Sequence, residues 1–503
     1  MALGILNTFI QWYIKKRVKQ MEVFMENPID TQKSVLLTLL YKAKDTEYGK
    51  KYGFQDIHLY NDFKNKVPLV TYEDFEPYIT RTRKGEKDII WPGQINWFAK
   101  SSGTTNAKSK FIPITEDSLQ ECHYKAGKDL FSIYAYNNPA TKIFECKNLR
   151  LGGTREDYEG FESKYGDLSA VLIDNLPFWA EWKSTPDKEV SLLKDWEIKM
   201  PAIVEQVVKQ NVGSLTGVPS WMMVLLRKVL ETTGKNYIDE VWPNVECFFH
   251  GGISFAPYKE QYASIFSKSL NYYEIYNASE GYFAMQDTNG SKDMLLMLDY
   301  GIYYEFIPMD EFYSTKPTIL SLEEVELHTN YAIVITTNGG LWRYIIGDTV
   351  KFVSQIPYRI KITGRTKFYI NAFGEELMVE NAEKALKEAE QKTQAIISEY
   401  TAGPIFMKGK EKGAHEWIIE FTRQPDSLEK FTEILDKELQ KLNSDYEAKR
   451  YNNMTLNMPI IHSARKNLFY DWMKKRGKLG GQNKVPRLAN DREYLDSLLK
   501  MDV

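Results

Sequence analysis

The chain has 503 residues, and its 65 basic and 68 acidic residues give a formal net charge of −3. A chain of this length is too long for one compact core, so we expect two or three domains. The even charge balance argues against nucleic acid as a partner, because binding to a phosphate backbone needs a large basic surface. A hydrophobic content of 43% and an aromatic content of 14% indicate well-packed globular domains rather than disorder.

The cysteines and histidines are few and scattered. The three cysteines (Cys122, Cys146 and Cys247) are an odd number without C-x-x-C spacing, and the six histidines form no H-x-H or H-E-x-x-H pattern. This usage argues against disulfides and a zinc site, and it favours a reducing, cytoplasmic location. We interpret the three cysteines as small buried hydrophobic residues.

The first predicted element is an amphipathic helix near the N-terminus. Apolar residues from Leu3 to Met25 recur at helical spacing, and the basic residues at 15–19 lie among them. A secretory signal carries its positive charge before the apolar run, whereas here the charge follows. The segment is also too short and too interrupted for stable insertion across a bilayer. We therefore expect a helix packed on the protein's own core, with peripheral membrane contact as the alternative.

Beyond this helix, short apolar runs alternate with amphipathic helices, which indicates an α/β architecture. Helices are expected at 34–44, 202–209 and 220–233. Strands are expected at 245–249, 271–276, 294–298, 303–307 and 331–336. From about residue 380 the order becomes a charged helix at 381–392, a strand at 417–421, a helix at 428–442 and a basic tail. This change predicts a separate small α+β domain.

A loop of small polar residues at 101–110 joins two strand-like runs. Its sequence, SSGTTNAKSK, places a glycine among serine and threonine hydroxyls, and two lysines follow. Such a turn can hold a polyphosphate, because successive backbone N–H groups form an anion nest and the lysines neutralise charge. It is not a Walker A loop, since no G-x-x-x-x-G-K-[ST] occurs in the chain. A surface hairpin with a polar tip is the alternative, and the loop alone does not decide between them.

Two further segments have the composition of nucleotide-binding loops. Gly251 and Gly252 follow a strand, and paired glycines allow a flat group to approach the backbone closely. Tyr276 and Glu280 lie where another strand runs into a polar turn. The ring could stack on a base, and the carboxylate could hold a magnesium ion that bridges phosphates. Taken singly, each segment is more simply explained as an ordinary turn or a solvated acid.

Two more such segments come later in the chain. Asp348 is expected at a turn after a strand, where it could accept hydrogen bonds from ribose hydroxyls. Arg365 and Lys367 lie in the sequence GRTK and could reach a nucleotide from a domain junction. The alternatives are a turn residue that satisfies its own backbone and a solvated basic surface.

The order of these segments resembles that of the adenylate-forming superfamily, which comprises acyl-CoA synthetases, peptide synthetase adenylation domains and luciferases. Within it, the chain is similar to the auxin-responsive Gretchen Hagen family of acyl acid–amido synthetases. The likeness rests on SSGTT at 101–105 with Lys110, GVPSWM at 217–222, GLWRY at 340–344 with Gly347-Asp348, and GGQNKVPR at 480–487. It extends over about 46–488. The chain is shorter than the plant members, as expected of a bacterial-type member, and it has Asn106-Ala107 where many members have a glycine.

The resemblance implies a role for each matching residue. The implied catalytic residues are Thr104, Glu280, Arg365 and Lys484. The implied contacts of ATP are Ser101, Ser102, Gly103, Thr105, Lys110, Gly251, Gly252, Tyr276 and Asp348, and Glu280 would coordinate Mg²⁺. Lys367 would be the hinge between the domains. Val218, Trp221, Met222 and Tyr282 would line the site of the acyl acid, although core packing explains Trp221 and Met222 equally well.

The resemblance also implies a fold and a reaction. A large N-terminal domain, 1–364, would contain mixed sheets sandwiched by helices and a β-barrel-like subdomain, and a small mobile α+β domain would follow at 365–503. A carboxylic acid would attack ATP to give an acyl adenylate and pyrophosphate. The amine of an amino acid would then displace AMP and form an amide. Since negative charge gathers on the phosphates, catalysis would consist of positioning and charge neutralisation.

Two other functions stay open. A ligase that forms acyl-CoA or another thioester would share the adenylation step, and a group of cations could serve it as a CoA-binding groove. These are Arg450, Arg465, Lys466, Lys474, Lys475 and Arg476. A non-catalytic nucleotide-binding regulator is the third function, and the combined presence of Thr104, Glu280, Asp348 and Lys484 argues against it.

Overall fold

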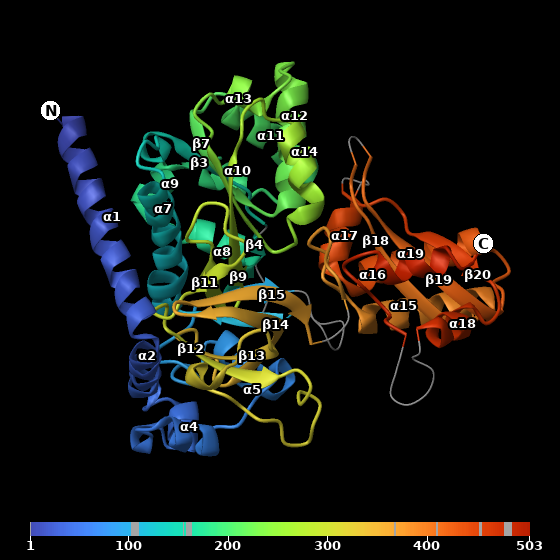
Figure 1. Cartoon of the computed structure of the whole chain (residues 1–503), viewed down its shortest axis with the longest axis horizontal. Coiled ribbons are helices and arrows are strands. Elements are labelled where there is room, and N and C mark those ends of the chain that lie inside the picture. The colour runs from blue at the N-terminus through green and yellow to red at the C-terminus, as the bar shows by residue number, and fades with distance from the viewer. Residues whose placement is uncertain are drawn as a thin grey trace.

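The computed structural model describes residues 2–101, 110–153, 155–156, 163–366, 369–408, 411–451, 455–476 and 485–502. A large N-terminal domain lies beside a smaller C-terminal domain, and helix α1 (Ala2–Glu26) runs along the outer edge of the large one (Figure 1). The expected α/β class, with a large N-terminal and a small C-terminal domain, is thereby confirmed.

One mixed sheet forms the centre of the large domain. In the described chain its eleven strands have the order β12-β13-β14-β15-β11-β10-β9-β8-β7-β3-β6. Their bounds are β3 Lys147–Arg150, β6 Ser184–Thr185, β7 Val212–Gly217, β8 Cys247–Gly251, β9 Asn271–Ala278, β10 Gly281–Met285, β11 Met294–Leu296, β12 Ile302–Pro308, β13 Asn330–Thr337, β14 Tyr344–Gln355 and β15 Tyr358–Arg365. Strands β6, β3, β7, β8 and β9 pair in parallel, and the pairs from β9 through β10 to β12 are antiparallel. The part expected to resemble a β-barrel is this antiparallel half.

The chemistry of the connections explains the two halves. Parallel strands need long crossovers, which helices supply here, whereas antiparallel strands can follow each other through short turns. The helices of the large domain are α2 Pro28–Ala43, α3 Glu47–Tyr52, α4 Tyr60–Lys66, α5 Tyr72–Arg83, α6 Glu116–Ser118, α7 Lys125–Asn137, α8 Leu168–Asp174, α9 Phe178–Trp182, α10 Lys188–Ser191, α11 Trp196–Val207, α12 Pro219–Thr233, α13 Ile238–Val241 and α14 Lys259–Ser264. A π-helical turn, η2 Leu119–Tyr124, leads into α7. A second sheet has the order β2-β1-β5-β4, with β1 Trp97–Ser101, β2 Lys110–Ile114, β4 Arg155–Glu156 and β5 Lys164–Gly166.

The small domain packs helices against a three-stranded sheet of order β18-β19-β20. The strands of the small domain as a whole are β16 Tyr369–Ile370, β17 Leu377–Met378, β18 Ile396–Ile405, β19 Ala414–Arg423 and β20 Ile460–Ala464. Its helices are α15 Val379–Thr393, α16 Leu428–Leu442, α17 Ser444–Arg450, α18 Leu468–Lys475 and α19 Glu493–Leu499. Every helix and strand expected beyond the N-terminal helix overlaps an observed one, with ends that differ by a few residues.

Helix α1 is packed on the protein's own core, as expected. Ile14, Met21 and Phe24 are each at most 2% exposed, and α1 lies against α7. Within the described residues, no helix is both long and apolar enough to cross a membrane. All three cysteines are buried, which confirms their interpretation as core residues.

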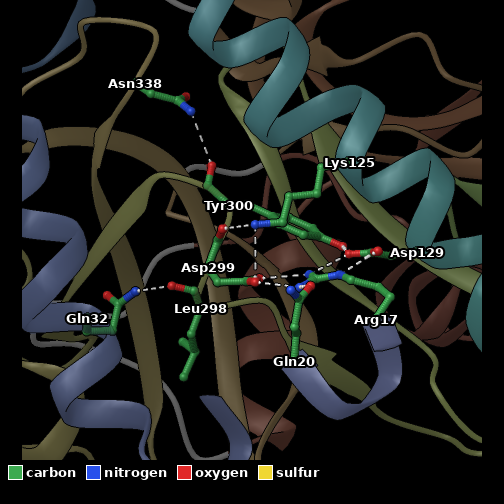
Figure 2. A network of polar contacts seen from close by, with 9 residues as sticks. All are labelled: Arg17, Gln20, Gln32, Lys125, Asp129, Leu298, Asp299, Tyr300 and Asn338. Atoms are coloured by element: carbon green, nitrogen blue, oxygen red, sulfur yellow. Dashed lines mark hydrogen bonds and ion pairs between the residues drawn. The ribbon is translucent and has the colours of Figure 1, made fainter. Parts of the chain in front are cut away.

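A buried charge network fastens α1 to α7 and to the segment between β11 and β12 (Figure 2). The Arg17 guanidinium lies 2.7 Å from the carboxylate of Asp129 on α7 and 2.8 Å from that of Asp299. Tyr300 donates its hydroxyl hydrogen to Asp129, and Lys125 donates to the main-chain oxygen of Asp299. Lys125 also pairs with Asp299, at 3.1 Å, so the loss of Arg17 would mainly deprive the buried Asp129 carboxylate of its paired cation.

We expect Arg17→Met to lower the free energy of unfolding by about 3 kcal/mol, because breaking a buried ion pair leaves an uncompensated charge. The first transition in urea unfolding curves of wild type and variant measures the change in the free energy of unfolding. Lys19→Met is the matched control, since Lys19 lies on the same helix and is exposed. Equal stability of the two variants would show that the network does not hold α1 in place.

Candidate active site

Four parallel strands end side by side and define the site. The register places the last residues of β3, β7, β8 and β9 at one edge of the sheet. Carboxyl ends of parallel strands are the usual place for ligand binding in α/β folds. A cavity of about 2080 Å³ opens at this edge, and residues of both domains line it.

Most of the predicted site residues that the structure describes line this one cavity. They are Lys110, Val218, Trp221, Gly251, Gly252, Tyr276, Glu280, Asp348 and Arg365. Met222 and Tyr282 do not line it. Met222 is completely buried in the core, and Tyr282 is 6% exposed and packs against Tyr300. Ser102, Gly103, Thr104, Thr105, Lys367 and Lys484 lie outside the described residues, as does the side chain of Ser101.

The ends of the proposed phosphate loop are held together. Strand β1 ends at Ser101 and β2 begins at Lys110, and these two residues pair across the antiparallel ladder. Phe111 donates its main-chain N–H to the hydroxyl of Tyr72 at the start of α5. The loop therefore starts and finishes at the cavity side of a β-hairpin, with the Lys110 side chain in the cavity wall.

Asp348 lies within strand β14, so the expectation that it occupies a turn is wrong. The preceding residue, Gly347, has a positive φ of 94° inside the strand. Asp348 pairs with Arg365 of β15 in register, and their side chains form an ion pair of 3.0 Å. The Tyr276 hydroxyl donates to the other carboxylate oxygen at 2.7 Å.

The contact between Tyr276 and Asp348 shows that the sheet curls. Strands β9 and β14 are four places apart in the sheet order, so a flat sheet would separate them by about 19 Å. A hydrogen bond between their side chains requires the antiparallel half to coil back upon itself. Coiling brings the glycines of the parallel half and the carboxylate of the antiparallel half to the same cavity.

Arg365 joins the two domains. Its Nη2 lies 3.1 Å from a carboxylate oxygen of Glu376, and its guanidinium lies over the ring of Tyr369 at 5.2 Å. Burial by itself would lower the pKa of Arg365, but the carboxylates of Glu376 and Asp348 outweigh burial and raise it. Arg365 is thus a fixed cation between an acid of the large domain and an acid of the small domain.

Glu280 presents a carboxylate without a bonded cation among the residues that the structure describes. It lies in the two-residue turn between β9 and β10, is half-buried, and lines the cavity. Burial raises its pKa to about 7, although Lys110 acts in the opposite direction. Burial also lowers the pKa of Lys110. The two charges lie near each other without a hydrogen bond or ion pair between them among the described contacts.

The donor set suits a magnesium ion that arrives with phosphates. Among the residues that the structure describes, no group of three or more His, Cys, Asp or Glu side chains could hold a metal by itself. Mg²⁺ does not need such a cage, because it commonly binds through one or two carboxylates together with substrate phosphates and water. Glu280, with its raised pKa, is a carboxylate that a nearby cation would stabilise in its charged form.

The paired glycines allow close approach at the end of β8. A Cβ on Gly251 would lie 2.4 Å from the main-chain oxygen of Ile275, which rules out any side chain there. Gly252 has a φ of +82°, a left-handed conformation that other residues rarely adopt. Asn371 of the small domain donates to the main-chain oxygen of Gly252.

Glu376, Arg150 and Lys449 are charged residues of the cavity that sequence reasoning did not find. Glu376 holds Arg365, and Arg150 lies at the end of β3. Lys449 of α17 reaches across from the small domain, and its Nζ lies 4.4 Å from the centre of the Trp221 ring. Burial lowers the pKa of Lys449. The doublet Gly152-Gly153 after Arg150 was the one available signal, because the same pattern marks the end of β8.

Three domain models of one family match the chain. They are the GH3 family N-terminal domain over residues 17–270, the central domain over 295–365 and the C-terminal domain over 380–493. The chain belongs to the GH3 family. The resemblance to the Gretchen Hagen family is thereby confirmed.

Individual relatives have low identity but long coverage. Indole-3-acetic acid-amido synthetase GH3.3 of Arabidopsis thaliana is 23% identical over 96% of this chain and 93% of the relative. Jasmonoyl–L-amino acid synthetase JAR4 of Nicotiana attenuata is 25% identical over 66% of this chain and 68% of the relative.

Two solved structures share the fold. AtGH3.15 acyl acid amido synthetase in complex with 2,4-DB has a TM-score of 0.63 at 18% identity, covering 97% of this chain and 96% of that one. The 2-hydroxyisobutyryl-CoA ligase in its thioesterification state has a TM-score of 0.58 at 13% identity, covering 94% and 92%. Fold membership is all that such identities establish.

The raised pKa of Glu280 predicts a pH-dependent stability. Its pKa is about 7 in the folded chain against an ordinary value of 4.5, so the folded protein binds the proton more tightly. Ionisation therefore costs folded stability increasingly as pH rises from about 4.5 to 7. Glu280→Gln cannot ionise, so its melting temperature should rise relative to wild type between pH 5 and pH 8. Melting curves in EDTA without nucleotide measure this difference.

Glu260→Gln is the control for this experiment, because Glu260 lies exposed on α14. Its difference from wild type should stay constant over the same pH range. If the difference for Glu280→Gln stayed constant as well, Glu280 would be a solvated acid with an ordinary pKa.

Proposed function

We propose that this protein is an ATP-dependent acyl acid–amido synthetase, an AMP-forming ligase that activates a carboxylic acid and transfers the acyl group to an amino acid. The observation that carries the proposal is the convergence of Lys110, Glu280, Asp348 and Arg365 on one large cavity. These groups come from separate parts of a GH3 family chain, and each has a chemistry suited to one part of a nucleotide.

Different walls of the cavity contact different parts of the nucleotide. Asp348, fixed by Tyr276 and Arg365, accepts hydrogen bonds from the ribose hydroxyls. Gly251 and Gly252 lie along the adenine, where the absence of side chains allows contact with the main chain. Lys110 faces the phosphates, and we assign the same role to the loop residues Ser101, Ser102, Gly103, Thr104 and Thr105.

The proposed role of Mg²⁺ is limited to the neutralisation of negative charge. Bound to Glu280 and to ATP, Mg²⁺ would neutralise charge on the phosphate oxygens as pyrophosphate departs. Glu280 holds its charged form when a cation is near, and the adjoining Lys110 adds a second positive charge. Arg365 stays protonated because two carboxylates flank it, so it supplies a permanent cation on the other side.

The chemistry proceeds in two steps. The carboxylate of the acid attacks the α-phosphorus of ATP, forms the acyl–phosphate bond, and pyrophosphate leaves. The amine then attacks the acyl carbon, AMP leaves with the electron pair of the broken bond, and the amine loses a proton. We assign Lys484 to the first step and place the hinge at Lys367, with the domain boundary between 364 and 365.

The contacts of the cations considered for a CoA-binding groove favour an amine over CoA as the acyl acceptor. Arg450 is buried against Asp436 and is therefore not part of a surface groove. Arg465 pairs with Asp471. Two of the cations considered for CoA are thus engaged within the small domain. We also place the protein in the reducing cytoplasm, which agrees with its three buried free cysteines.

The function is tested by pyrophosphate release from Mg²⁺–ATP across a panel of carboxylic acids, with amino acids or CoA added separately. We expect release that rises with an amino acid, together with a new amide in the mass spectrum, since the amine removes the adenylate. Stimulation by CoA alone would identify a thioester ligase. Binding of ATP without release for any acid would identify a non-catalytic nucleotide-binding protein.

Lys484→Ala should lower adenylate formation by about 10² to 10³-fold, the usual cost of removing one charge-stabilising donor, while ATP binding changes little. Pyrophosphate exchange and the dissociation constant of a non-hydrolysable ATP analogue measure the two effects. Lys466→Ala, at an exposed position of the small domain, is the control. Equal loss of exchange and of binding would contradict the role of Lys484 in the chemical step.

A further inference from the structure

Arg150 is a cation of the cavity wall that the proposed reaction does not use. It is the last residue of β3 and pairs with Thr216 of β7. Its neighbour Leu149 is completely buried in a core cluster, so the alternation of a strand turns Arg150 to the opposite face. Tyr124 of η2 and Phe131 of α7 line the cavity together with Arg150.

The Arg150 guanidinium has no partner in the part of the chain that the structure describes. Its Nε and Nη2 are shielded from solvent and form no hydrogen bond. Burial lowers its pKa to about 10, and the carboxylate of Glu181 acts only by its field, without an ion pair. A pKa of about 10 leaves the group positively charged at neutral pH.

Other buried arginines of this protein show what Arg150 lacks. Arg17 is held by Asp129 and Asp299, Arg343 by Glu305, and Arg450 by Asp436. Burying a charge is costly unless it is paired and hydrogen-bonded, which explains these carboxylates. Arg150 is half-buried with two shielded nitrogens, has no carboxylate bonded to it among the described residues, and faces a cavity instead. An anionic ligand in the cavity would supply the missing partner.

Arg150 lies too far from the phosphates to hold the carboxylate that is activated. Through Thr216 and Phe249 its register reaches Tyr273, three strands away, which corresponds to about 14 Å across the sheet. Glu280 lies beyond the end of β9, and the five residues from Tyr273 to Ala278 add about 16 Å along the strand. Along the sheet, Arg150 and Glu280 are thus about 20 Å apart.

The walls near Arg150 are apolar apart from Asn148, on the same face of β3, and Lys183, which donates to the main-chain oxygen of Phe144. Ile143, Phe144, Leu172 and Leu176 line the cavity in this region together with Phe131. The loop after Arg150 is fixed, because Lys199 donates to the main-chain oxygens of Gly152 and Gly153. This part of the cavity therefore combines a basic residue next to a fixed loop with apolar side chains beside it.

We propose that Arg150 binds a second anionic group of the acyl acid, at the end remote from the carboxyl group that is activated. The inference rests on the proposed function, because it names the substrate class of the same site. The preferred acids have an apolar middle and an anionic far end, as in α,ω-dicarboxylic acids and aromatic dicarboxylic acids. A guanidinium suits a carboxylate here, since its planar N–H groups can bind two oxygens at once.

The test compares matched acids on wild type, Arg150→Met and Arg150→Lys. The probes are octanedioic acid against octanoic acid, and benzene-1,4-dicarboxylic acid against 4-methylbenzoic acid. ATP–pyrophosphate exchange gives kcat/KM for each acid, and calorimetry gives its dissociation constant without turnover. Arg423→Met is the control, because Arg423 is exposed in the small domain and does not line the cavity.

We expect wild type to prefer at least one diacid over its partner by about 10- to 100-fold, the range of a hydrogen bond to a charged group. Arg150→Met should abolish this preference, Arg150→Lys should retain part of it, and Arg423→Met should leave it intact. Melting curves of all variants establish that they are folded. The preference should appear in KM and in the dissociation constant rather than in kcat.

Other outcomes separate this inference from the proposed function. If Arg150→Met lowered kcat/KM equally for both acids of a pair, or if wild type showed no diacid preference, the inference would be overturned. ATP–pyrophosphate exchange by the wild type would still support the proposed adenylation. Diacid binding that depends on Arg150 but gives no exchange would uphold the anion site and overturn the adenylation.

Discussion

The ion pair between Asp348 and Arg365 is the contact on which the geometry of the cavity depends. Asp348 is also bound by Tyr276, so one carboxylate connects β9, β14 and β15 across a curled sheet. Arg365 extends the connection to Glu376 of the small domain. Each side chain gives the other a bonded partner in a place where an isolated charge would be costly. This pair of side chains thereby connects the two halves of the sheet with each other and with the small domain.

A second buried ion cluster supports the opposite wall of the cavity. Asp129 lies on α7, whose other face contributes Phe131 to the cavity, and Arg17 ties that helix to α1. The N-terminal helix is therefore more than a cover for the core. It fixes the position of the wall against which an acyl chain would lie, and Ile14 of α1 itself lines the cavity.

The sequence predicted much of the fold because its signals are local. Strand-like runs, amphipathic helices and the change of pattern near residue 380 each depend on neighbouring residues, and the order of the motifs indicated the family. The position of Asp348 was wrong because its strand is defined by pairing with β13 and β15, which no local pattern reveals. Gly347 suggested a turn, whereas the structure accommodates its positive φ within the strand.

The candidate site was predicted less completely, for geometric reasons. Trp221 and Met222 are adjacent in sequence, but successive residues of a helix point about 100° apart, so one lines the cavity and the other fills the core. Arg150 was missed because an arginine in a strand is unremarkable by sequence. Its significance comes from the lack, among the described residues, of a carboxylate bonded to it, which depends on the packing of elements far apart in the chain.

Lys449 gives the cavity a positive charge that belongs to the small domain. It lies on the Trp221 ring, so the charge is present only in the arrangement in which the two domains meet as they do here. A rotation of the small domain would withdraw this charge and lower the electrostatic potential inside the cavity. Anionic molecules would then be held more firmly before the rotation than after it. The Lys449 side chain would in this way couple the orientation of the small domain to the retention of anionic ligands.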